Sequence, residues 1–467
     1  MVKDMLVVSA SDPIEKLHLI FSLYRLGISY HFENEIEDYL NHLFISLPNQ
    51  LIDDKDYDLQ TISIVFQVFR FHGYKMLSDV FSKFQDGDGK FKKELIDDVK
   101  GIISLYEATH FRMTGEVILD EALTFTTKKL EEIIENQSSD VPPHVRKRIA
   151  NALFRPYHHS MQRIEARQFI SFYKKDESKN DVLLKFAKYD FNRVQLLHQQ
   201  ELSILSSWYK ESNMKSKLPY ARHRIVEALF YVVGVYFEPR YARARNILCK
   251  LTTLIGFLDD TYEAYGLFEE LQHLTDAIQR FEIVPMDELP ADLKPMFETL
   301  LNVHDEVEDQ VREEGRSYSV CYTKDEVKKY STAEQLEARW RHEKYVPTFD
   351  EYLENGMYSG CSRMAFAQIM DEDGRGFSTG WTCYMKQHNV SRNETIEAFR
   401  EKIAGAWKCI NEEYCMKPTT VPRAILRAAL NYQRMLDFAY RDNDEYTKPE
   451  LSFKSIIPKV ILHPISL

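Results

Sequence analysis

Three acidic residues follow an apolar segment near the middle of the chain. Asp259, Asp260 and Glu263 come after the run 251–258, in which leucine and isoleucine recur at three- and four-residue spacing. This spacing predicts a helix with one apolar face, on which Asp259 and Glu263 lie one turn apart. Mg²⁺ prefers a few carboxylate oxygens completed by waters and phosphate oxygens. Because paired acids on a helix are usually a solvated face, the pattern alone leaves both interpretations open.

Two arginines precede these acids in an otherwise acidic protein. Arg224 stands 35 residues before Asp259, and Arg222 stands two positions earlier. A guanidinium group pairs bidentately with phosphate oxygens and keeps its charge, so it can hold a departing diphosphate. A surface patch of ion pairs is the alternative that the residues themselves leave open.

Helices must position these groups. The 467 residues include 16 glycines and 16 prolines, fewer than turn-rich β architectures use, and this favours an all-α fold. Amphipathic segments run from about 12 to 170, and a strong helical period resumes at about 181. The charged segment 173–181 between them predicts a linker, and hence two helical domains.

Composition excludes several other classes. A formal net charge of −12 argues against nucleic-acid binding, which needs concentrated basic surface. The sequence contains no uninterrupted run of about 20 apolar residues, so we expect no membrane span. The six cysteines contain no CxxC pair, which favours reduced core thiols over a zinc site or a disulfide framework. The N-terminal residues resemble neither a signal nor a transit peptide, which predicts a cytoplasmic protein.

The segment 218–266, LPYARHRIVEALFYVVGVYFEPRYARARNILCKLTTLIGFLDDTYEAYG, closely resembles the plant terpene synthase family. It carries an RxR element, an EP-bearing helix and an aspartate-rich DDxxD-type motif. Six further stretches are similar to the same family: 12–37, 161–173, 188–211, 339–352, 383–391 and 406–414. Together these stretches extend over most of the chain, and the set is most similar to the sesquiterpene branch of the angiosperm enzymes.

This resemblance implies a fold and an activity. It implies an N-terminal, α-barrel-like helical domain at 1–176 and a C-terminal class I terpenoid synthase α-bundle at 177–467. The implied enzyme is a monomeric, magnesium-dependent lyase of the cytosol that ionises and cyclises a prenyl diphosphate, with farnesyl diphosphate the favoured substrate. Mn²⁺ is a second candidate ion.

The resemblance also assigns roles to residues. Tyr231 falls where the sesquiterpene cyclases often place a tryptophan against the carbocation, and an aromatic face stabilises such a cation. Tyr440, Asp444 and Tyr446 resemble residues of the loop that covers the cavity. The implied site therefore comprises metal ligands, diphosphate-binding arginines and residues of the catalytic cavity: Asp259, Asp260 and Glu263; Arg222 and Arg224; and Tyr231, Tyr440 and Asp444.

The sequence departs from the family in three ways. Glu263 replaces the usual final aspartate and keeps its charge. The chain begins just before the first family motif, without the upstream arginine–tryptophan element that caps the site in relatives. The connection 356–383 is too short for two helices and the second metal motif, because Asp371, Glu372 and Asp373 lack a serine or threonine at +4 and a glutamate at +8. A catalytically impaired or inactive homologue is therefore the alternative function.

Overall fold

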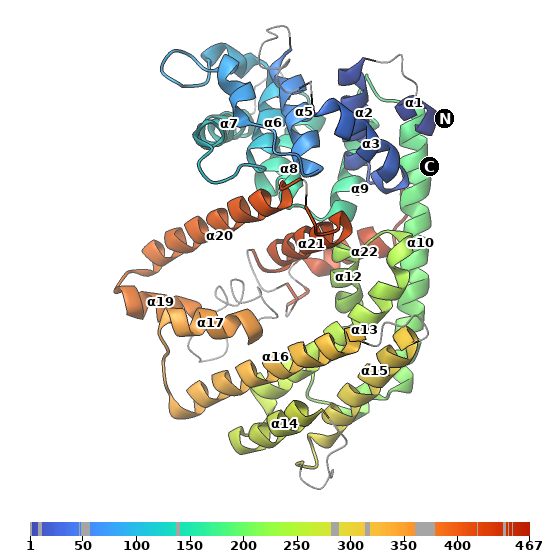
Figure 1. The fold of residues 1–467 in the computed structure, drawn as a ribbon, viewed down its shortest axis with the longest axis vertical. Coiled ribbons are helices and arrows are strands. Elements are labelled where there is room, and N and C mark those ends of the chain that lie inside the picture. Colours follow the sequence, from blue (N-terminus) through green and yellow to red (C-terminus); the bar gives the residue numbers. More distant parts are fainter. Residues whose placement is uncertain are drawn as a thin grey trace. The chain divides into compact units, whose positions relative to one another are not determined.

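The described elements of the computed structural model are helices joined by turns and loops, which confirms the expected all-α class (Figure 1). Among the described residues, the isolated bridge Gln85–Phe91 is the single β-type pairing. The structure describes residues 2–7, 12–45, 47, 57–136, 141–281, 289–312, 318–359, 379–417, 419–441, 445–446, 448–450 and 452–467.

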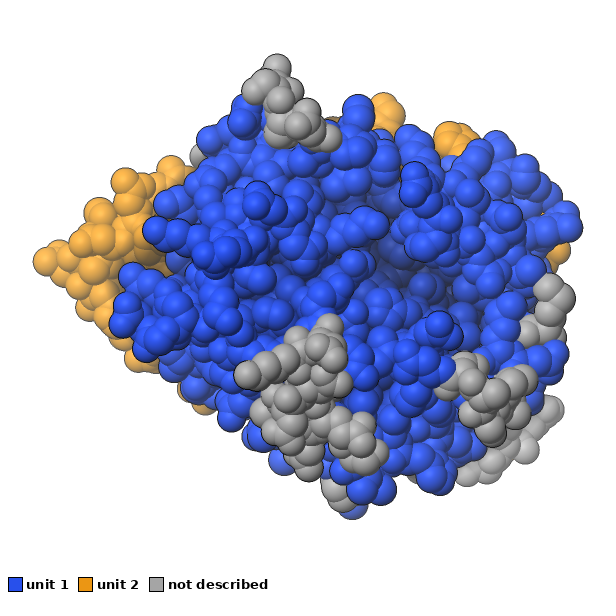
Figure 2. All heavy atoms as spheres, turned by 90° about the horizontal axis from the view of Figure 1, so that it is seen from above, with its two compact units in different colours: residues 1–193, 399–434, 464–467 blue, residues 194–398, 435–463 orange. Residues whose placement is uncertain are grey.

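The chain divides into two compact units (Figure 2). Unit 1 comprises residues 1–193, 399–434 and 464–467, and unit 2 comprises residues 194–398 and 435–463. The charged segment predicted as a linker falls between helix α9, which ends at Tyr173, and helix α10, which begins at Asp181. Each unit combines segments that are far apart in sequence, so the units do not correspond to two continuous ranges. The domain ranges 1–176 and 177–467 therefore stay a prediction.

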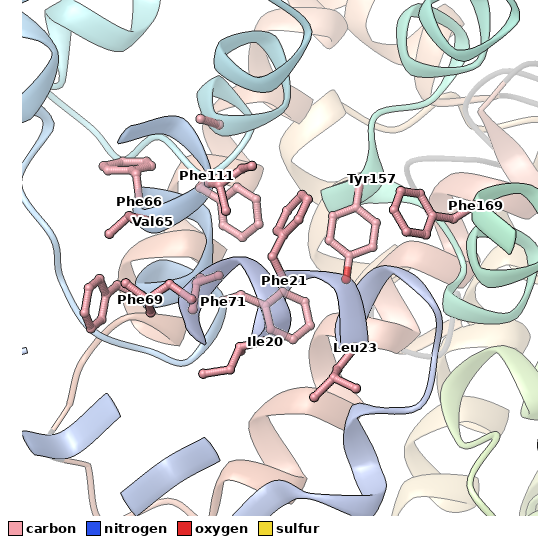
Figure 3. Close-up of a cluster of buried hydrophobic side chains, with 14 of the residues drawn as sticks. Ile20, Phe21, Leu23, Val65, Phe66, Phe69, Phe71, Phe111, Tyr157 and Phe169 are labelled. Atoms are coloured by element: carbon pink, nitrogen blue, oxygen red, sulfur yellow. The ribbon is translucent and has the colours of Figure 1, made fainter. Parts of the chain in front are cut away.

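Unit 1 encloses an aromatic core. Phe66, Phe69 and Phe111 are almost fully buried and pack with residues from several helices of the unit (Figure 3). Acidic N-caps begin some of these helices; Asp98, for example, accepts a hydrogen bond of 2.8 Å from the Gly101 N–H. The helices are α1 (Val2–Val7), α2 (Pro13–Arg25), α3 (Glu33–Leu43), α5 (Leu59–Phe71), α6 (Val99–Thr109), α7 (Val117–Glu135), α8 (Pro143–Phe154), α9 (Gln162–Tyr173) and parts of α10 (Asp181–Glu211), α20 (Arg392–Tyr414) and α21 (Arg423–Tyr440).

Unit 2 holds the acidic motif. Its core packs Leu254, Phe257 and Leu258 against the leucines and valines of neighbouring helices, so the apolar face predicted before Asp259 is buried. Its remaining helices are α11 (Met214–Lys217), α12 (Ile225–Val235), α13 (Ala242–Asp260), α14 (Phe268–Arg280), α15 (Lys294–Arg312), α16 (Tyr318–Glu343), α17 (Phe349–Ser359), α19 (Gly380–His388) and α22 (Phe453–Ile461).

Two further expectations concern the cysteines and the membrane. Five cysteines fall in the described part and are free thiols, of which Cys249, Cys383 and Cys415 are buried. Cys321 and Cys409 are exposed, so the expectation of core thiols is wrong for these two. None of the described helices is both long enough and apolar enough to cross a bilayer.

A buried ionic cluster in unit 1 contains a carboxyl group with a raised pKa. Glu107 accepts a hydrogen bond of 2.7 Å from the Tyr157 N–H, and its Oε1 lies 3.9 Å from Arg25, which also pairs with Glu165. Burial raises the pKa of Glu107 to about 7; the charge of Glu165 adds to the effect, while Arg25 opposes it. The cluster therefore holds a proton near neutral pH.

We predict that Glu107→Gln flattens the pH dependence of stability. Between pH 4.5, the ordinary pKa, and about pH 7, the unfolded chain releases this proton while the folded chain keeps it, so wild-type stability falls as pH rises. A glutamine can still accept from Tyr157 and does not ionise. Thermal unfolding at pH 5 and pH 8 measures the effect, with the exposed Glu131→Gln as control. An unchanged difference between the two pH values would contradict the assignment.

Candidate active site

The acidic motif lies where helix α13 changes its geometry. Asp259 and Asp260 end the α-helix, and Glu263 falls on a π-helical turn, Thr261–Tyr265. The Gly266 N–H donates to the Thr261 carbonyl at 2.9 Å, a five-residue spacing. Glu263 is therefore not one ordinary α-helical turn above Asp259, which corrects the expectation. Wide turns of this kind are frequent at functional sites.

Packing explains the wide turn. Tyr262 is 1% exposed, and its hydroxyl shares a hydrogen bond of 2.7 Å with Thr275 on α14. Gly266 closes the turn against Leu271, where an added Cβ would lie 2.4 Å from a Leu271 methyl carbon. Because Tyr262 is anchored and the turn ends at Gly266, this one turn contains five residues. The position of Glu263 relative to Asp259 therefore differs from that in an α-helix.

Arg222 of the predicted arginine element is hydrogen-bonded to this motif. The Arg222 backbone N–H donates to Asp260 Oδ2 at 2.6 Å, its Nε donates to Asp260 Oδ1, and its Nη2 donates to Asp259 Oδ2 at 3.0 Å. Tyr220 stacks on Tyr265, with ring centroids 3.7 Å apart. Burial opposes the charge of Arg222, but the nearby carboxylates, Asp260 foremost, raise its pKa above the ordinary value. In this structure Arg222 therefore pairs with two of the three predicted metal ligands, Asp259 and Asp260.

Aromatic residues gather beside Arg224. The Arg224 guanidinium lies 5.9 Å from the ring centroid of Tyr446, and Tyr231 meets the same ring edge-on at 6.1 Å. Gly256, one turn before the acids on α13, leaves space here, since a Cβ at this position would lie 3.8 Å from the Tyr446 hydroxyl oxygen. Both tyrosines are largely buried or half-buried. The aromatic group thus lies next to the acidic end of α13.

The roles predicted for Tyr440, Asp444 and the acids at 371–373 are not tested by the structure. Tyr440 is 5% exposed at the end of α21. Asp444 lies outside the described residues, as do Asp371, Glu372 and Asp373. Their assigned roles stay predictions.

The sequence interpretation missed three charged residues on α16. Glu334 and Glu337 interact electrostatically with the acidic motif, Glu334 with Asp259 and both with Glu263. Arg341 donates a hydrogen bond to the Tyr262 carbonyl. Their spacing of three and four residues indicates one helix face, but the sequence 333–345 is so rich in charge that it resembles a solvated surface.

The donor set suits a hard divalent cation. Asp259, Glu263 and Glu334 offer carboxylate oxygens, and Glu334 is 3% exposed with an Oε2 that accepts no hydrogen bond from the described residues. No three acidic, histidine or cysteine side chains in the described part already converge as a complete metal site. Mg²⁺ does not require such a cage, because it keeps waters and takes oxygens from a phosphate ligand. An acidic motif beside two arginines and an aromatic group suits the binding of a metal-complexed anion.

Comparison with known proteins identifies the family. Residues 1–153 match the family model of the terpene synthase N-terminal domain, and residues 210–371 match that of the terpene synthase family metal binding domain. A probable terpene synthase 6 of Ricinus communis is 44% identical, covering 99% of this chain and 91% of the relative. The chain therefore belongs to the terpene synthase family. It has the class I terpene synthase fold, and its homologues are lyases that act on prenyl diphosphates.

Two further comparisons extend this finding. A (-)-5-epieremophilene synthase of Salvia miltiorrhiza is 40% identical, covering all of this chain and 91% of the relative. The crystal structure of isoprene synthase from grey poplar, in complex with three Mg²⁺ ions and dimethylallyl-S-thiolodiphosphate, has a TM-score of 0.91 at 29% identity and covers 100% of this chain and 95% of the poplar chain. The alignments with the Ricinus and Salvia relatives extend over 511 and 506 positions, more than the 467 residues of this chain. Both relatives therefore have residues within the aligned span that this chain lacks.

We predict that Mg²⁺ compensates for the loss of Arg222. In Arg222→Ala, Asp260 loses its cation while it remains 6% exposed, so the metal-free stability should fall by about 2 kcal/mol. The metal can then replace the missing charge without competing with the guanidinium. Mg²⁺ should therefore raise the melting temperature of Arg222→Ala more than that of the wild type.

Arg224→Ala is the matched control, because Arg224 belongs to the same element and contacts Tyr446 instead. Equal Mg²⁺-induced shifts in the wild type and in Arg222→Ala would contradict the idea that the arginine and the metal share these carboxylates.

Proposed function

We propose that this protein is a magnesium-dependent sesquiterpene synthase that ionises and cyclises farnesyl diphosphate and releases diphosphate. The observation that carries the proposal is the attachment of Arg222 to Asp259 and Asp260, one helical turn from the aromatic group around Tyr446. A cation-binding end and an aromatic interior thus adjoin on one helix.

The chain's own residues suit this reaction. Asp259, Asp260 and Glu263 would hold Mg²⁺, which when bound supplies a Lewis acid for the diphosphate oxygens. Arg222 and Arg224 carry permanent charges that can hold the diphosphate after its bond to carbon breaks. The rings of Tyr231 and Tyr446 offer π-faces to a carbocation and, being partly to fully buried, limit the access of water.

The substrate class rests on similarity. Relatives at 40–44% identity include sesquiterpene synthases, which favours farnesyl diphosphate. Isoprene synthase has the same fold with a dimethylallyl compound bound, so the fold itself does not select chain length. A monomeric state, a cytosolic location and the use of Mn²⁺ in place of Mg²⁺ belong to the same proposal, and size-exclusion chromatography, cell fractionation and metal substitution test them.

A catalytically impaired homologue is the second candidate function. It is favoured by the short connection 356–383, which lacks the second metal motif, and by alignments longer than the chain. The match to the metal binding domain also ends at residue 371, although the second unit continues to His463. Loss of one set of metal ligands removes stabilisation from the departing diphosphate, where most of the rate enhancement arises.

We predict that Mg²⁺ binds weakly alone and more tightly with inorganic pyrophosphate. The carboxylates form an incomplete ligand shell, which phosphate oxygens complete. Titration calorimetry with and without pyrophosphate measures this difference. The double variant Asp259→Ala/Asp260→Ala should lose the effect, while the exposed Glu269→Gln on α14 should retain it. Equal metal affinity in the double variant would refute the metal assignment.

We also predict low turnover of farnesyl diphosphate, limited by the short connection and not by Glu263. A ligand misplaced by about 1 Å costs about a hundredfold in rate. Replacing the connection with the intact segment of an active relative should raise turnover by up to about a hundredfold, whereas Glu263→Asp keeps the same charge and should change it far less. Gas chromatography of the products with geranyl and farnesyl diphosphates measures both. Full activity of the native chain, or of Glu263→Asp alone, would disprove this explanation.

A further inference from the structure

Glu334 is a buried carboxylate with a free oxygen. It lies on α16, is 3% exposed, and its Oε2 accepts no hydrogen bond from the described residues. A polar group in such a position costs free energy unless a partner occupies the space beside it. The charges that act on Glu334 include those of Asp259 and Glu263, so the side chain lies within electrostatic reach of the acidic motif.

Glu337, one turn further along the same helix, is in a different situation. Its Oε1 accepts hydrogen bonds from Asn355 at 3.1 Å and from Ser359 at 2.6 Å, both on α17. These bonds fix the carboxylate of Glu337 within the contact between α16 and α17. Both bonds go to Oε1 of Glu337, whereas Glu334 has a fully buried oxygen that accepts no hydrogen bond from the described residues.

Acidic and basic groups from several elements interact around the motif. Five carboxyl groups from α13, the π-helical turn and α16 interact there, and Arg222 and Arg341 oppose them. Arg222 is committed to Asp259 and Asp260. Burial raises the pKa of Glu334 well above its ordinary value, and the charges of Glu337, Asp259 and Glu263 raise it further. The five groups are Asp259, Asp260, Glu263, Glu334 and Glu337.

We propose that Glu334 is an additional ligand, direct or through a water, of the divalent cation held by Asp259 and Glu263. This inference rests on the proposed metal binding at the acidic motif and adds a residue from a second helix to it. Because α16 packs against the π-helical turn, Glu334 supplies an oxygen from a different direction than α13 does. Mg²⁺ requires such oxygens at near-octahedral angles, and the connection 356–383 does not provide the second metal motif.

The test compares Mg²⁺ affinity, measured by calorimetry in the presence of inorganic pyrophosphate, among variants of the full-length protein. Glu334→Gln keeps the shape and removes the charge, and we expect it to weaken Mg²⁺ binding about 10- to 100-fold, as loss of a metal-supporting carboxylate typically does. Glu343→Gln, an exposed acid at the end of the same helix, is the matched control and should bind as the wild type does.

Thermal unfolding separates this role from a purely structural one. Without metal, Glu334→Gln should melt at or above the wild-type temperature, because glutamine has a similar shape and removes a carboxyl group whose ionisation burial opposes. Mg²⁺ with pyrophosphate should raise its melting temperature less than that of the wild type. A variant that is destabilised without metal but binds Mg²⁺ normally would assign Glu334 to packing and overturn the proposal.

Two more variants, Asp259→Asn and Glu334→Asp, distinguish failure of this proposal from failure of the proposed function. If Asp259→Asn abolishes Mg²⁺ binding while Glu334→Gln binds normally, the additional ligand is refuted and the proposed function stands. If Asp259→Asn also binds normally, the metal site itself is refuted. Should Glu334→Gln fail to fold, Glu334→Asp keeps the charge but withdraws it by one methylene; weaker Mg²⁺ binding supports the proposal, and wild-type affinity overturns it.

Discussion

The negative charge at the C-terminal end of α13 is the constraint on which this site depends. Asp259 and Asp260 place two adjacent carboxylates at the end of α13, where the chain enters the π-helical turn. Asp260 is nearly buried, so water cannot stabilise it well. A cation must therefore lie against this helix end. Arg222 meets that requirement with its backbone N–H and with two nitrogens of its side chain.

This requirement organises the neighbouring chain. Tyr220 stacks on Tyr265 and its hydroxyl shares a hydrogen bond of 2.9 Å with Thr261, so the arginine element runs along the π-helical turn. Arg224 follows two residues later at the start of α12, and its guanidinium lies beside Tyr446. One electrostatic attachment therefore sets the position of the acids and that of the aromatic group together, and Mg²⁺ would enter a site in which an arginine already occupies part of the ligand sphere.

The sequence predicted the parts of the site that depend on local pattern. The apolar spacing before Asp259 predicted α13 and its buried face, and family resemblance pointed to Arg222, which the structure joins to the acids. The π-helical turn was not predictable, because it arises from Tyr262 binding Thr275 and from the tight packing of Gly266 on Leu271. Both contacts are tertiary.

Glu334 was missed for a related reason. Within a charge-rich sequence, acids on the solvent side and acids on the buried side of α16 have the same composition, and burial alone distinguishes them. The assignment of Asp444 and the loss of the second metal motif stay predictions, because these residues lie outside the described part of the chain. The sequence therefore pointed to the acids of a continuous motif, and it did not point to Glu334 on another helix.

The contacts between α17 and α19, the helices on either side of the connection 356–383, indicate what a shorter connection affects. The Phe349 N–H at the start of α17 donates to Gln387 on α19 at 2.6 Å, and Gln387 donates to Asp350 at 3.0 Å. Phe349 and Tyr384 also meet edge-to-face at 4.9 Å. These contacts hold the two helices together independently of the residues between them, so a shorter connection is compatible with a packed unit. Packing tolerates a shorter connection, whereas metal coordination depends on individual oxygens, so we expect a shorter connection to affect the supply of metal ligands. Under the proposal above, Glu334 offers a carboxylate oxygen from α16, which packs against α14 and the π-helical turn.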